Sequence, residues 1–359
     1  MTASKPGISF EFFPPKSEEG WDKLQTVHES LSAVNPEFFS VTYGAGGSTQ
    51  EDTIKTVLSL HAKGISTAPH ISCIGSTGDK VLQLLESYAD HGIDRLVALR
   101  GDMPSGMGGR SGQFAYAEDL VVFIQKHFPQ RFHIEVAAYP EMHPQARDMD
   151  SDLQHFVSKV SAGASGAITQ YFYNADAYFG FVDDCARAGI SIPIVPGIMP
   201  ITNYATLVRF SDICGAELPQ WIRSRLKQYQ DDEASLKAFG FDVVANLCLD
   251  LLENGVEGLI PTKRMAKTTE IAEYIYFLCS SKNTQITNEL LNISGQPAPL
   301  AKLMLIPDAW SKKSKTLSKD HRQLFNFLNS TMEPWDGPAA IAGTDNEWVI
   351  AATDRNGLR

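Results

Sequence analysis

The six residues "VEGLIP" at 256–261 decide how many strands this chain contributes to its sheet. They form a short, β-rich apolar run directly after a stretch of helical period, "SLKAFGFDVVANLCLDLLENG" at 235–255. Seven similar runs lie before residue 201, and a segment of helical period follows each of them. Eight strands that alternate with helices fit a (β/α)8 TIM barrel better than an open, doubly wound sheet. The sequence therefore predicts an α/β fold of the TIM-barrel class.

The earlier strand candidates are rich in β-branched and aromatic residues. They cover residues 8–13, 38–43, 66–73, 95–101, 133–140, 166–173 and 192–200. The helical segments between them have apolar residues at helical spacing, and several end at the Gly expected just past a helix. These segments cover residues 21–34, 51–64, 78–92, 117–128, 150–163 and 176–189.

The composition indicates a globular protein that binds a small molecule. Of the 359 residues, 43% are hydrophobic, which is enough for one barrel-sized domain or two smaller ones. The formal charge is −11, from 31 basic and 42 acidic residues. "WSKKSK" is the longest basic run, so nucleic acid is not expected as a partner, because phosphate binding needs clustered Lys and Arg.

The cellular setting is also constrained by the sequence. "MTASKPG" at the start has no apolar signal region and no segment reaches transmembrane length, so we expect a cytoplasmic chain without a membrane partner. The five cysteines lie far apart without a CxxC pair, which indicates reduced, mostly buried thiols and no metal site. They are Cys73, Cys185, Cys214, Cys248 and Cys279.

Polar residues stand where the predicted strands end. In a (β/α)8 barrel the chemistry lies at the carboxyl ends of the strands, so these residues are candidates for the site. Each of them alone is explained as well by a structural role, such as a polar group paired inside the barrel or a helix cap. Their common position at one face favours a functional site. They are Glu11, Thr42, Tyr43, His70, Arg100, Asp102, Tyr139 and Gln170.

Glu11 stands in "ISFEFFPPK", a run that is otherwise built for burial. Its neighbours Phe10, Phe12 and Phe13 are expected to remove water from the carboxyl group. Desolvation raises the pKa of a carboxylic acid, which keeps it protonated near neutral pH. Glu11 is therefore a candidate proton donor.

The loop "TYGAGGST" at 42–49 partly matches the dinucleotide-binding pattern GxGxxG, but Thr49 stands where the last Gly belongs. Its glycines are better explained by a tight turn than by a pyrophosphate-binding loop, and such a turn can form with or without a cofactor beside it. The chain contains no GxxxxGK[ST], HExxH or GxSxG sequence. P-loop, zincin and serine-hydrolase functions therefore have no motif to support them.

Seven motifs, in order and at barrel spacing, resemble the methylenetetrahydrofolate reductase family over residues 8 to about 259. They are "SFEFFPPK", "SVTYGAGGS", "APHISC", "LVALRGD", "VAAYPEMHP", "AITQYFY" and "PIVPGIMPITN". The resemblance implies a TIM barrel that holds FAD, takes hydride from NAD(P)H and reduces 5,10-methylenetetrahydrofolate to 5-methyltetrahydrofolate. It also implies a place in one-carbon metabolism and methionine biosynthesis.

The same resemblance assigns residues. Glu11 would be the acid that protonates the folate nitrogen and so opens the five-membered ring to the iminium that accepts hydride. Asp102 would lie close to the flavin ring and the pterin, Gln170 would contact the folate ring, and Phe210 would stack with a ring of folate or nicotinamide. Contacts to FAD would come from Thr42, Tyr43, Ala45, His70, Arg100, Gly101, Asp102, Tyr139, His143, Ala146, Asp152, His155 and Lys159.

The two helical residues in this set differ in support. His155 is explained almost equally well as a surface histidine of a helix. Lys159 is the better candidate, because an ammonium group there would meet a cofactor phosphate.

The carboxyl-terminal part resembles other families. Residues 260–295 resemble the end of a short-chain dehydrogenase/reductase, and about 297–359 resemble an internal fragment of the glutaminase domain of glutamate synthase. No Tyr is followed by Lys four positions later, and the chain begins "MTASK" rather than with a nucleophilic Cys, so neither parent activity is expected. The sequence predicts a chimera: a barrel over 1–259, a segment 260–295 that supplies a closing helix, and a poorly packed or mobile segment 296–359.

Two functions remain open at this point. One is an active, flavin-dependent reductase of methylenetetrahydrofolate, and the other is a flavin-binding barrel whose catalysis is impaired because its last strand and helix are replaced. A nicotinamide-dependent dehydrogenase is a third and weaker hypothesis, because the GxGxxG pattern is incomplete and the YxxxK pair is absent. The choice between NADH and NADPH is also left open. So is the oligomeric state, including whether the chain forms a homo-oligomer.

Overall fold

A computed structural model of the chain describes residues 7–43, 47–74, 76–101, 113–261, 340–344 and 349–353. The chain forms two compact units, Met1–Cys279 and Ser280–Arg359.

The first unit is built on parallel strands. Seven of them hydrogen-bond in the order β2-β3-β4-β5-β6-β7-β8, and three more in the order β1-β10-β9, with every pair parallel. The strands are β1 (Gly7–Ile8), β2 (Phe10–Phe12), β3 (Phe39–Val41), β4 (Thr67–Ser72), β5 (Arg95–Leu99), β6 (His133–Ala138), β7 (Gly166–Thr169), β8 (Ile194–Val195), β9 (Gly197–Ile198) and β10 (Gly258–Pro261).

The two sets of strands join into one closed barrel at residues 7–12. The Ser9 N–H donates to Leu259 O (3.2 Å) on one side, while Ile8 O accepts from Glu37 N (2.7 Å) on the other. β1 and β2 therefore act as one strand between β10 and β3. β8 and β9 likewise form one strand around Pro196, whose carbonyl accepts from Ile260 N (3.1 Å). Eight strands close the sheet, so the (β/α)8 prediction is confirmed, "VEGLIP" included.

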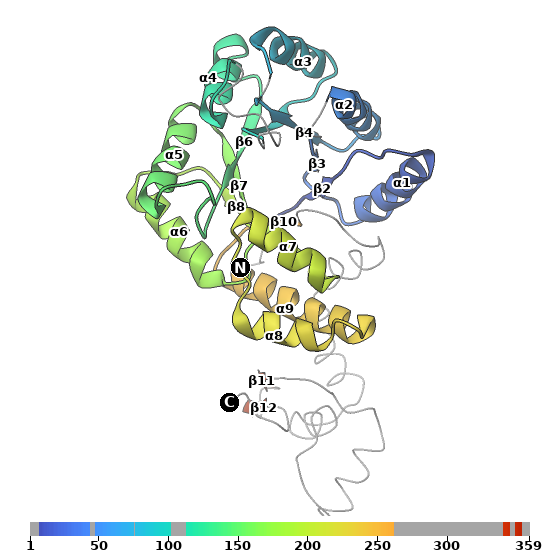
Figure 1. The fold of residues 1–359 in the computed structure, drawn as a ribbon, viewed down its shortest axis with the longest axis vertical. Coiled ribbons are helices and arrows are strands. Elements are labelled where there is room, and N and C mark those ends of the chain that lie inside the picture. The colour runs from blue at the N-terminus through green and yellow to red at the C-terminus, as the bar shows by residue number, and fades with distance from the viewer. Residues whose placement is uncertain are drawn as a thin grey trace, which may run out of the picture. The chain divides into compact units, whose positions relative to one another are not determined.

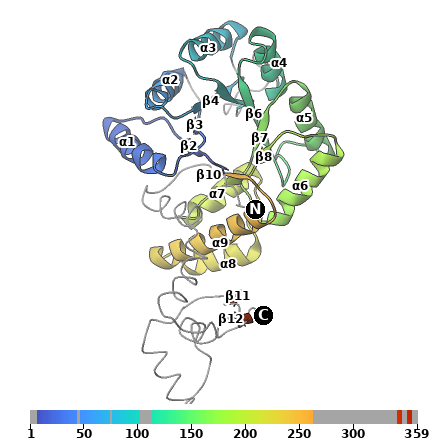
Figure 2. The same ribbon diagram turned by 180° about the vertical axis from the view of Figure 1, so that it is seen from behind.

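Helices cover the outside of this barrel (Figures 1 and 2). Most begin at a Ser, Thr, Asp or Asn whose side chain accepts a first-turn N–H, as Thr77 does for α3 and Asp148 for α5. The helices are α1 (Glu18–Ser32), α2 (Gly47–His61), α3 (Gly78–Asp90), α4 (Ala117–His127), α5 (Met149–Ser161), α6 (Ala175–Arg187), α7 (Tyr204–Cys214), α8 (Gln220–Gln228) and α9 (Glu233–Glu253).

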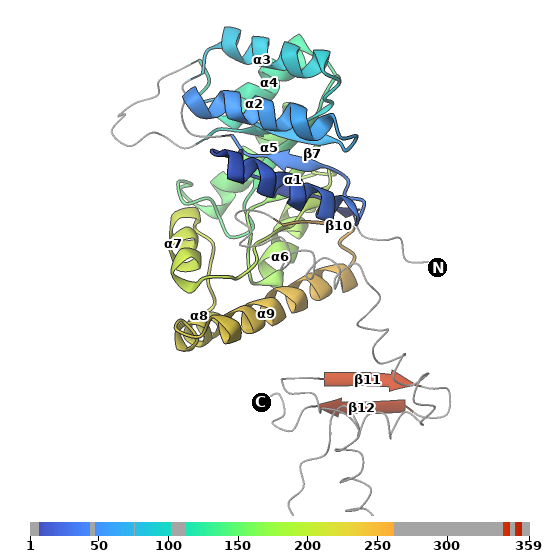
Figure 3. The same cartoon turned by 90° about the vertical axis from the view of Figure 1, so that its right-hand side faces the viewer.

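Two of these helices, α7 and α8, were not predicted. They lie between the seventh strand and α9, where a (β/α)8 pattern requires only one helix. α8 is nine residues long and buries only Ile222 and Leu226, so its apolar pattern is too short to recognise. Figure 3 shows α8 beside the start of α9, where the Trp221 and Phe239 rings meet edge to face at 6.1 Å.

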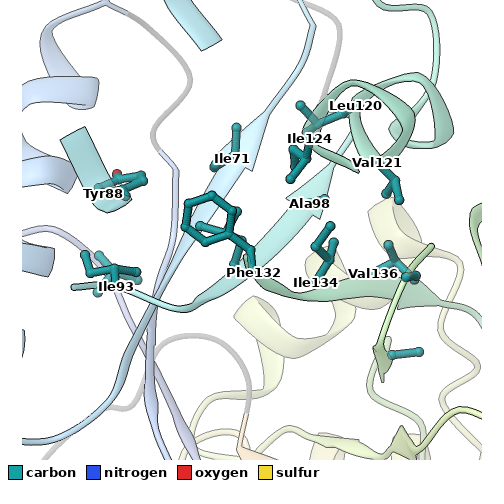
Figure 4. Packing of buried hydrophobic residues seen from close by; sticks show 14 of the residues in the cluster. Ile71, Tyr88, Ile93, Ala98, Leu120, Val121, Ile124, Phe132, Ile134 and Val136 are labelled. Carbon is teal, nitrogen blue, oxygen red and sulfur yellow. The ribbon is translucent and has the colours of Figure 1, made fainter. Parts of the chain in front are cut away.

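The main hydrophobic core lies between the strands and the helices around them. Figure 4 shows Ile71, Ala98, Ile134 and Val136 on β4, β5 and β6 pointing towards Leu120, Val121 and Ile124 of α4. All seven are at most 1% exposed. Burial of this apolar surface is the main force that holds the helices on the barrel. Inside the barrel, a smaller cluster contains Phe38, Ala68, Val97 and Ile260.

The second unit is described at one hairpin. β11 (Ala340–Thr344) pairs antiparallel with β12 (Val349–Thr353), and Ala342 lies opposite Ala351. The predicted dehydrogenase-like segment 260–295, apart from the end of β10, lies outside the described residues, and so does most of 296–359. Among the helices that are described, none is long and apolar enough to cross a membrane.

Candidate active site

The polar strand-end residues are brought together by the barrel. Because its strands are parallel, their carboxyl ends meet at one rim. Glu11 and His70 lie within β2 and β4, and the others follow directly after their strands. The residues that the structure places at this rim are Glu11, Thr42, Tyr43, His70, Arg100, Gly101, Tyr139 and Gln170. Ala45 and Asp102 lie outside the described residues.

Glu11 and His70 face each other inside the barrel. Strand pairing sets Glu11 opposite Ser40, and Ser40 opposite Ala68, which is two residues before His70 on the same face of β4. The Glu11 Oε2 atom lies 3.5 Å from His70 Nε2, and both side chains are more than nine-tenths buried. At this separation the two groups form an ion pair when His70 is protonated, but they are too far apart for a short hydrogen bond.

The expected surroundings of Glu11 were partly wrong. Phe10 and Phe12 alternate to the outer face of the strand, where their rings lie 5.9 and 5.0 Å from the ring of Phe39. Phe13 is 45% exposed. Water is therefore kept from Glu11 by the barrel interior, and not by the aromatic residues next to it in the sequence.

The end of β5 is fixed by backbone geometry. Gly101 has φ +85°, and a Cβ atom there would overlap the Ser72 hydroxyl, so only glycine fits. The Ser72 hydroxyl donates to Arg100 O (3.1 Å), which also accepts from Ile74 N (2.9 Å). The Arg100 guanidinium donates to Gln145 Oε1 in the loop after β6. This contact joins two neighbouring rim loops and places a positive charge between them.

The loop after β6 is held by hydrogen bonds around His143. Its N–H donates to Asp152 Oδ2 (2.8 Å), and its Nδ1 accepts from Gln145 N (3.0 Å), which leaves the ring hydrogen of a neutral imidazole on Nε2. The His143 carbonyl accepts from Ala146 N (2.9 Å). Tyr139 meets the His143 ring edge to face at 4.6 Å. Four of the predicted residues therefore form one ordered unit.

The two predicted residues on α5 lie in different surroundings. His155 is exposed and stacks on Tyr116, with ring centroids 5.6 Å apart. The Lys159 ammonium donates to Ala137 O of β6 (2.5 Å), and desolvation lowers the pKa of Lys159 to about 8. This ammonium group contacts the wall of the barrel.

Thr42 and Tyr43 follow β3, beside the strand of Glu11. Thr42 N donates to Phe12 O (2.9 Å), and Thr42 O accepts from the Thr53 hydroxyl (3.1 Å), which ties α2 to this rim. Burial raises the pKa of Tyr43, so its phenol stays neutral and keeps its hydrogen.

The two predicted substrate residues come from different elements. Gln170 follows β7, and its side-chain oxygen Oε1 accepts a hydrogen bond from Tyr171 N (3.2 Å). This bond orients the side-chain amide, with its oxygen towards the backbone. Phe210 lies on α7, is partly buried and has the Arg209 guanidinium 5.5 Å from its ring centroid. α7 itself packs against Tyr171, whose hydroxyl lies 3.2 Å from that of Ser211.

One rim residue was missed by the sequence analysis. Glu141 follows Tyr139 and Pro140, and its Oε2 accepts from Glu217 N (2.7 Å) in the loop after α7. Burial, with the nearby Glu217 charge, raises the pKa of Glu141 to about 7. An acid in "YPEMHP" was the available signal, but proximity to Glu217 depends on α7, which the sequence did not predict.

Comparison with known proteins matches two family models. The model described as "Methylenetetrahydrofolate reductase" matches residues 1–275, and the one described as "Glutamine amidotransferases class-II" matches residues 265–359. The predicted family is therefore confirmed, and the second match is consistent with the predicted chimera.

Curated relatives and a solved structure agree with the first match. A 5,10-methylenetetrahydrofolate reductase of Buchnera aphidicola is 38% identical over 273 residues, covering 76% of this chain and 90% of the relative. The Escherichia coli enzyme of that name is 37% identical over 251 residues, covering 70% and 83%. A solved Clostridium thermocellum protein that "binds two copies of 5-methyl-5,6,7,8-tetrahydrofolic acid" has a TM-score of 0.57 and 18% identity, covering 77% and 96%, and supports the fold alone.

Proposed function

The chain belongs to the methylenetetrahydrofolate reductase family through residues 1–275, and we propose that it reduces 5,10-methylenetetrahydrofolate to 5-methyltetrahydrofolate with FAD and NAD(P)H. Family membership and relatives of that name support the reduction of methylenetetrahydrofolate. The choice of flavin and nicotinamide is our proposal from the resemblance and from the residues at the rim.

The Glu11–His70 pair is the observation that carries this proposal. Reduction of a methylene bridge to a methyl group needs a proton on the folate nitrogen as well as a hydride on carbon. Glu11 Oε2 lies 3.5 Å from His70 Nε2 at the rim where ligands of a (β/α)8 barrel bind. Held by β2 and β4, the pair can keep a proton away from bulk water and give it to a bound substrate.

The rim residues fit a flavin nucleotide in their chemistry. Arg100 brings positive charge to the rim of a chain whose formal charge is −11, which suits the phosphates of FAD. Tyr139 and His143 offer aromatic surface, and the neutral His143 presents an N–H donor. Thr42, Tyr43, Ala45, His70, Gly101, Asp102, Ala146, Asp152, His155 and Lys159 complete the proposed set.

The bound flavin would supply hydride transfer, which protein side chains cannot perform. The chain's own residues have the other tasks. Glu11 donates the proton, and His70 holds the acid in place. Gln170 and Phe210 orient the folate from β7 and α7. By the resemblance, Asp102 would place a negative charge near the reacting rings, where it would stabilise cationic character in the substrate.

The remaining parts of the proposal concern organisation. We assign the reductase to the barrel of residues 1–259 and no catalytic role to residues 260–295 or 296–359. We also propose a cytoplasmic location and folate and nicotinamide as small-molecule partners. The impaired alternative is a folded barrel that has lost catalysis; it shares this fold, in which β10 pairs with both of its neighbours, and the relatives give it no support.

The cofactor proposal is tested on the purified full-length chain. A flavin absorbance spectrum, FAD in the heat-released fraction, and NADH or NADPH oxidation with an artificial electron acceptor are expected. A colourless protein that neither binds added FAD nor oxidises either nicotinamide would overturn the proposal. A yellow protein that oxidises nicotinamide but never reduces the folate would instead establish the impaired alternative.

A further inference from the structure

Two loops at the rim contact each other at two points. One is the loop between β6 and α5, and the other follows α7. The Glu217 N–H donates to Glu141 Oε2 at 2.7 Å. Gly215 ends α7 with φ +73°, and a Cβ atom there would lie 3.0 Å from Pro144 Cγ. A methyl group at residue 215 would therefore push Pro144 away by a few tenths of an ångström, in addition to the strain of its positive φ.

These loops carry residues from the two halves of the proposed reaction. The β6–α5 loop carries Tyr139 and His143, which we assign to FAD. α7 carries Phe210, which we assign to the substrate, and the Cys214 thiol donates to the Phe210 carbonyl at 2.8 Å. The contact between Glu141 and Glu217 therefore joins the cofactor side of the rim to the substrate side.

Two opposing effects act on the Glu141 carboxyl group in this contact: burial favours its neutral form, whereas the hydrogen bond from Glu217 N–H favours its charged form. The Glu141 Oε1 atom is buried without a hydrogen-bond partner, so a negative charge on this group would be poorly solvated at that oxygen. The titratable groups that face it are the Glu217 carboxyl, whose negative charge disfavours a charge on Glu141, and the Tyr171 phenol, which burial keeps neutral. Burial is the larger effect, and with the Glu217 charge it raises the pKa of Glu141 from 4.5 to about 7 despite the opposing hydrogen bond from Glu217 N–H.

We propose that Glu141, as the neutral acid, is a positioning residue that ties the loop of Tyr139 and His143 to α7 and so keeps Phe210 in place for the folate. The proposal rests on the function proposed above. Ionisation of Glu141 puts a partly buried charge between the loops, and the cost of burying this charge outweighs the stronger hydrogen bond from Glu217 N–H, so the contact weakens. Substrate binding is therefore expected to weaken as the pH rises through neutrality, independently of Glu11.

Hydrogen exchange of the full-length protein tests the contact without requiring turnover. Glu141 has a pKa of about 7 when the loops are in contact, and we take 4.5 when they are apart. The protection of the amides of residues 214–218 against exchange should therefore fall about tenfold from about pH 6 to about pH 8.5, after correction for intrinsic exchange. Glu141→Gln, a neutral side chain of the same shape, should show no such fall. Glu217→Gln removes the neighbouring charge and should reduce the fall. Glu86→Gln, on the exposed face of α3, is the matched control and should behave as the wild type.

Kinetics then test the consequence for the substrate. The KM for the folate should rise with pH in the wild type over the same range and stay flat in Glu141→Gln. Gly215→Ala, which strains the contact between the loops without changing a charge, should raise this KM about fivefold at every pH, with a smaller effect on kcat.

The outcomes separate this proposal from the one it rests on. Equal pH dependence of exchange in the wild type and Glu141→Gln would show that protonation of Glu141 does not control the contact between the loops, and would overturn the proposal. A loosened loop with an unchanged folate KM in Gly215→Ala would overturn the positioning role. A wild type that never reduces the folate would refute the proposed function, while the exchange experiment would still decide whether Glu141 ties the loops.

Discussion

The replacement Glu11→Gln separates the two halves of the proposed reaction. Hydride entry from the nicotinamide needs no proton from Glu11, whereas reduction of the folate does. Glu11 is only 9% exposed, so water has little access to replace the lost acid. Loss of a positioned general acid typically slows a reaction about 10²–10⁴-fold, which corresponds to about 2.7–5.4 kcal/mol in the barrier.

The structure also predicts what this replacement leaves intact. Glutamine has the size of glutamate, so the packing beside His70 is kept. A side-chain oxygen or nitrogen of residue 11 then stays about 3.5 Å from His70 Nε2. We therefore expect normal folding and normal reduction of the flavin. Glu11→Asp keeps the acid but withdraws it by one methylene group, and we expect an intermediate loss of folate reduction, about 10²-fold.

Anaerobic stopped-flow measurements of flavin absorbance monitor each half separately. The first experiment mixes oxidised protein with NADH or NADPH, and the second mixes reduced protein with methylenetetrahydrofolate. Glu86→Gln is the matched surface control. Folate reduction by Glu11→Gln at the wild-type rate would refute the assignment, and equal losses in both halves would show that the replacement disturbs the site as a whole.

Three further predictions concern the barrel and its rim. Asp102→Asn should raise the flavin midpoint potential and slow folate reduction, because a negative charge near the ring disfavours its reduction; a redox titration with an unchanged or lower potential would exclude this role. Gly101→Ala should destabilise the protein by about 2 kcal/mol and weaken flavin retention, since its Cβ would overlap Ser72 at φ +85°; an unchanged Tm would contradict the geometry. Burial lowers the pKa of His28 from 6.5, so the fold loses stability as the pH falls below that value, by at most about 1.4 kcal/mol per pH unit. His28→Phe should therefore gain stability relative to the wild type between about pH 7 and pH 5, and a constant difference in Tm would refute this.

The alternation of strands and helices made the barrel predictable. Each strand except the split first and seventh ones is a single apolar run with an obvious helix after it. Strand-end residues such as His70 and Gln170 could be placed at one rim from topology alone. The closing strand β10 was recognisable because "VEGLIP" follows a long helical period.

Contacts that depend on the path of the chain could not be predicted. Alternation along the strand places Glu11 opposite Phe10 and Phe12, but its approach to His70 depends on the register of three strands, β2, β3 and β4. The tie between Glu141 and Glu217 spans 76 residues and depends on α7. Lys159 illustrates the same limit, because helical spacing does not reveal that its ammonium group meets the carbonyl of Ala137.

The most direct test of the whole account is the product made by the full-length protein. The chain is incubated anaerobically with FAD, NADH or NADPH and 5,10-methylenetetrahydrofolate, and the folates are separated and identified by mass spectrometry. We predict 5-methyltetrahydrofolate in amounts matching the nicotinamide consumed, and a rate at least about 10²-fold lower for Glu11→Gln. Nicotinamide oxidation without this product, or equal product formation by the wild type and Glu11→Gln, would contradict the account.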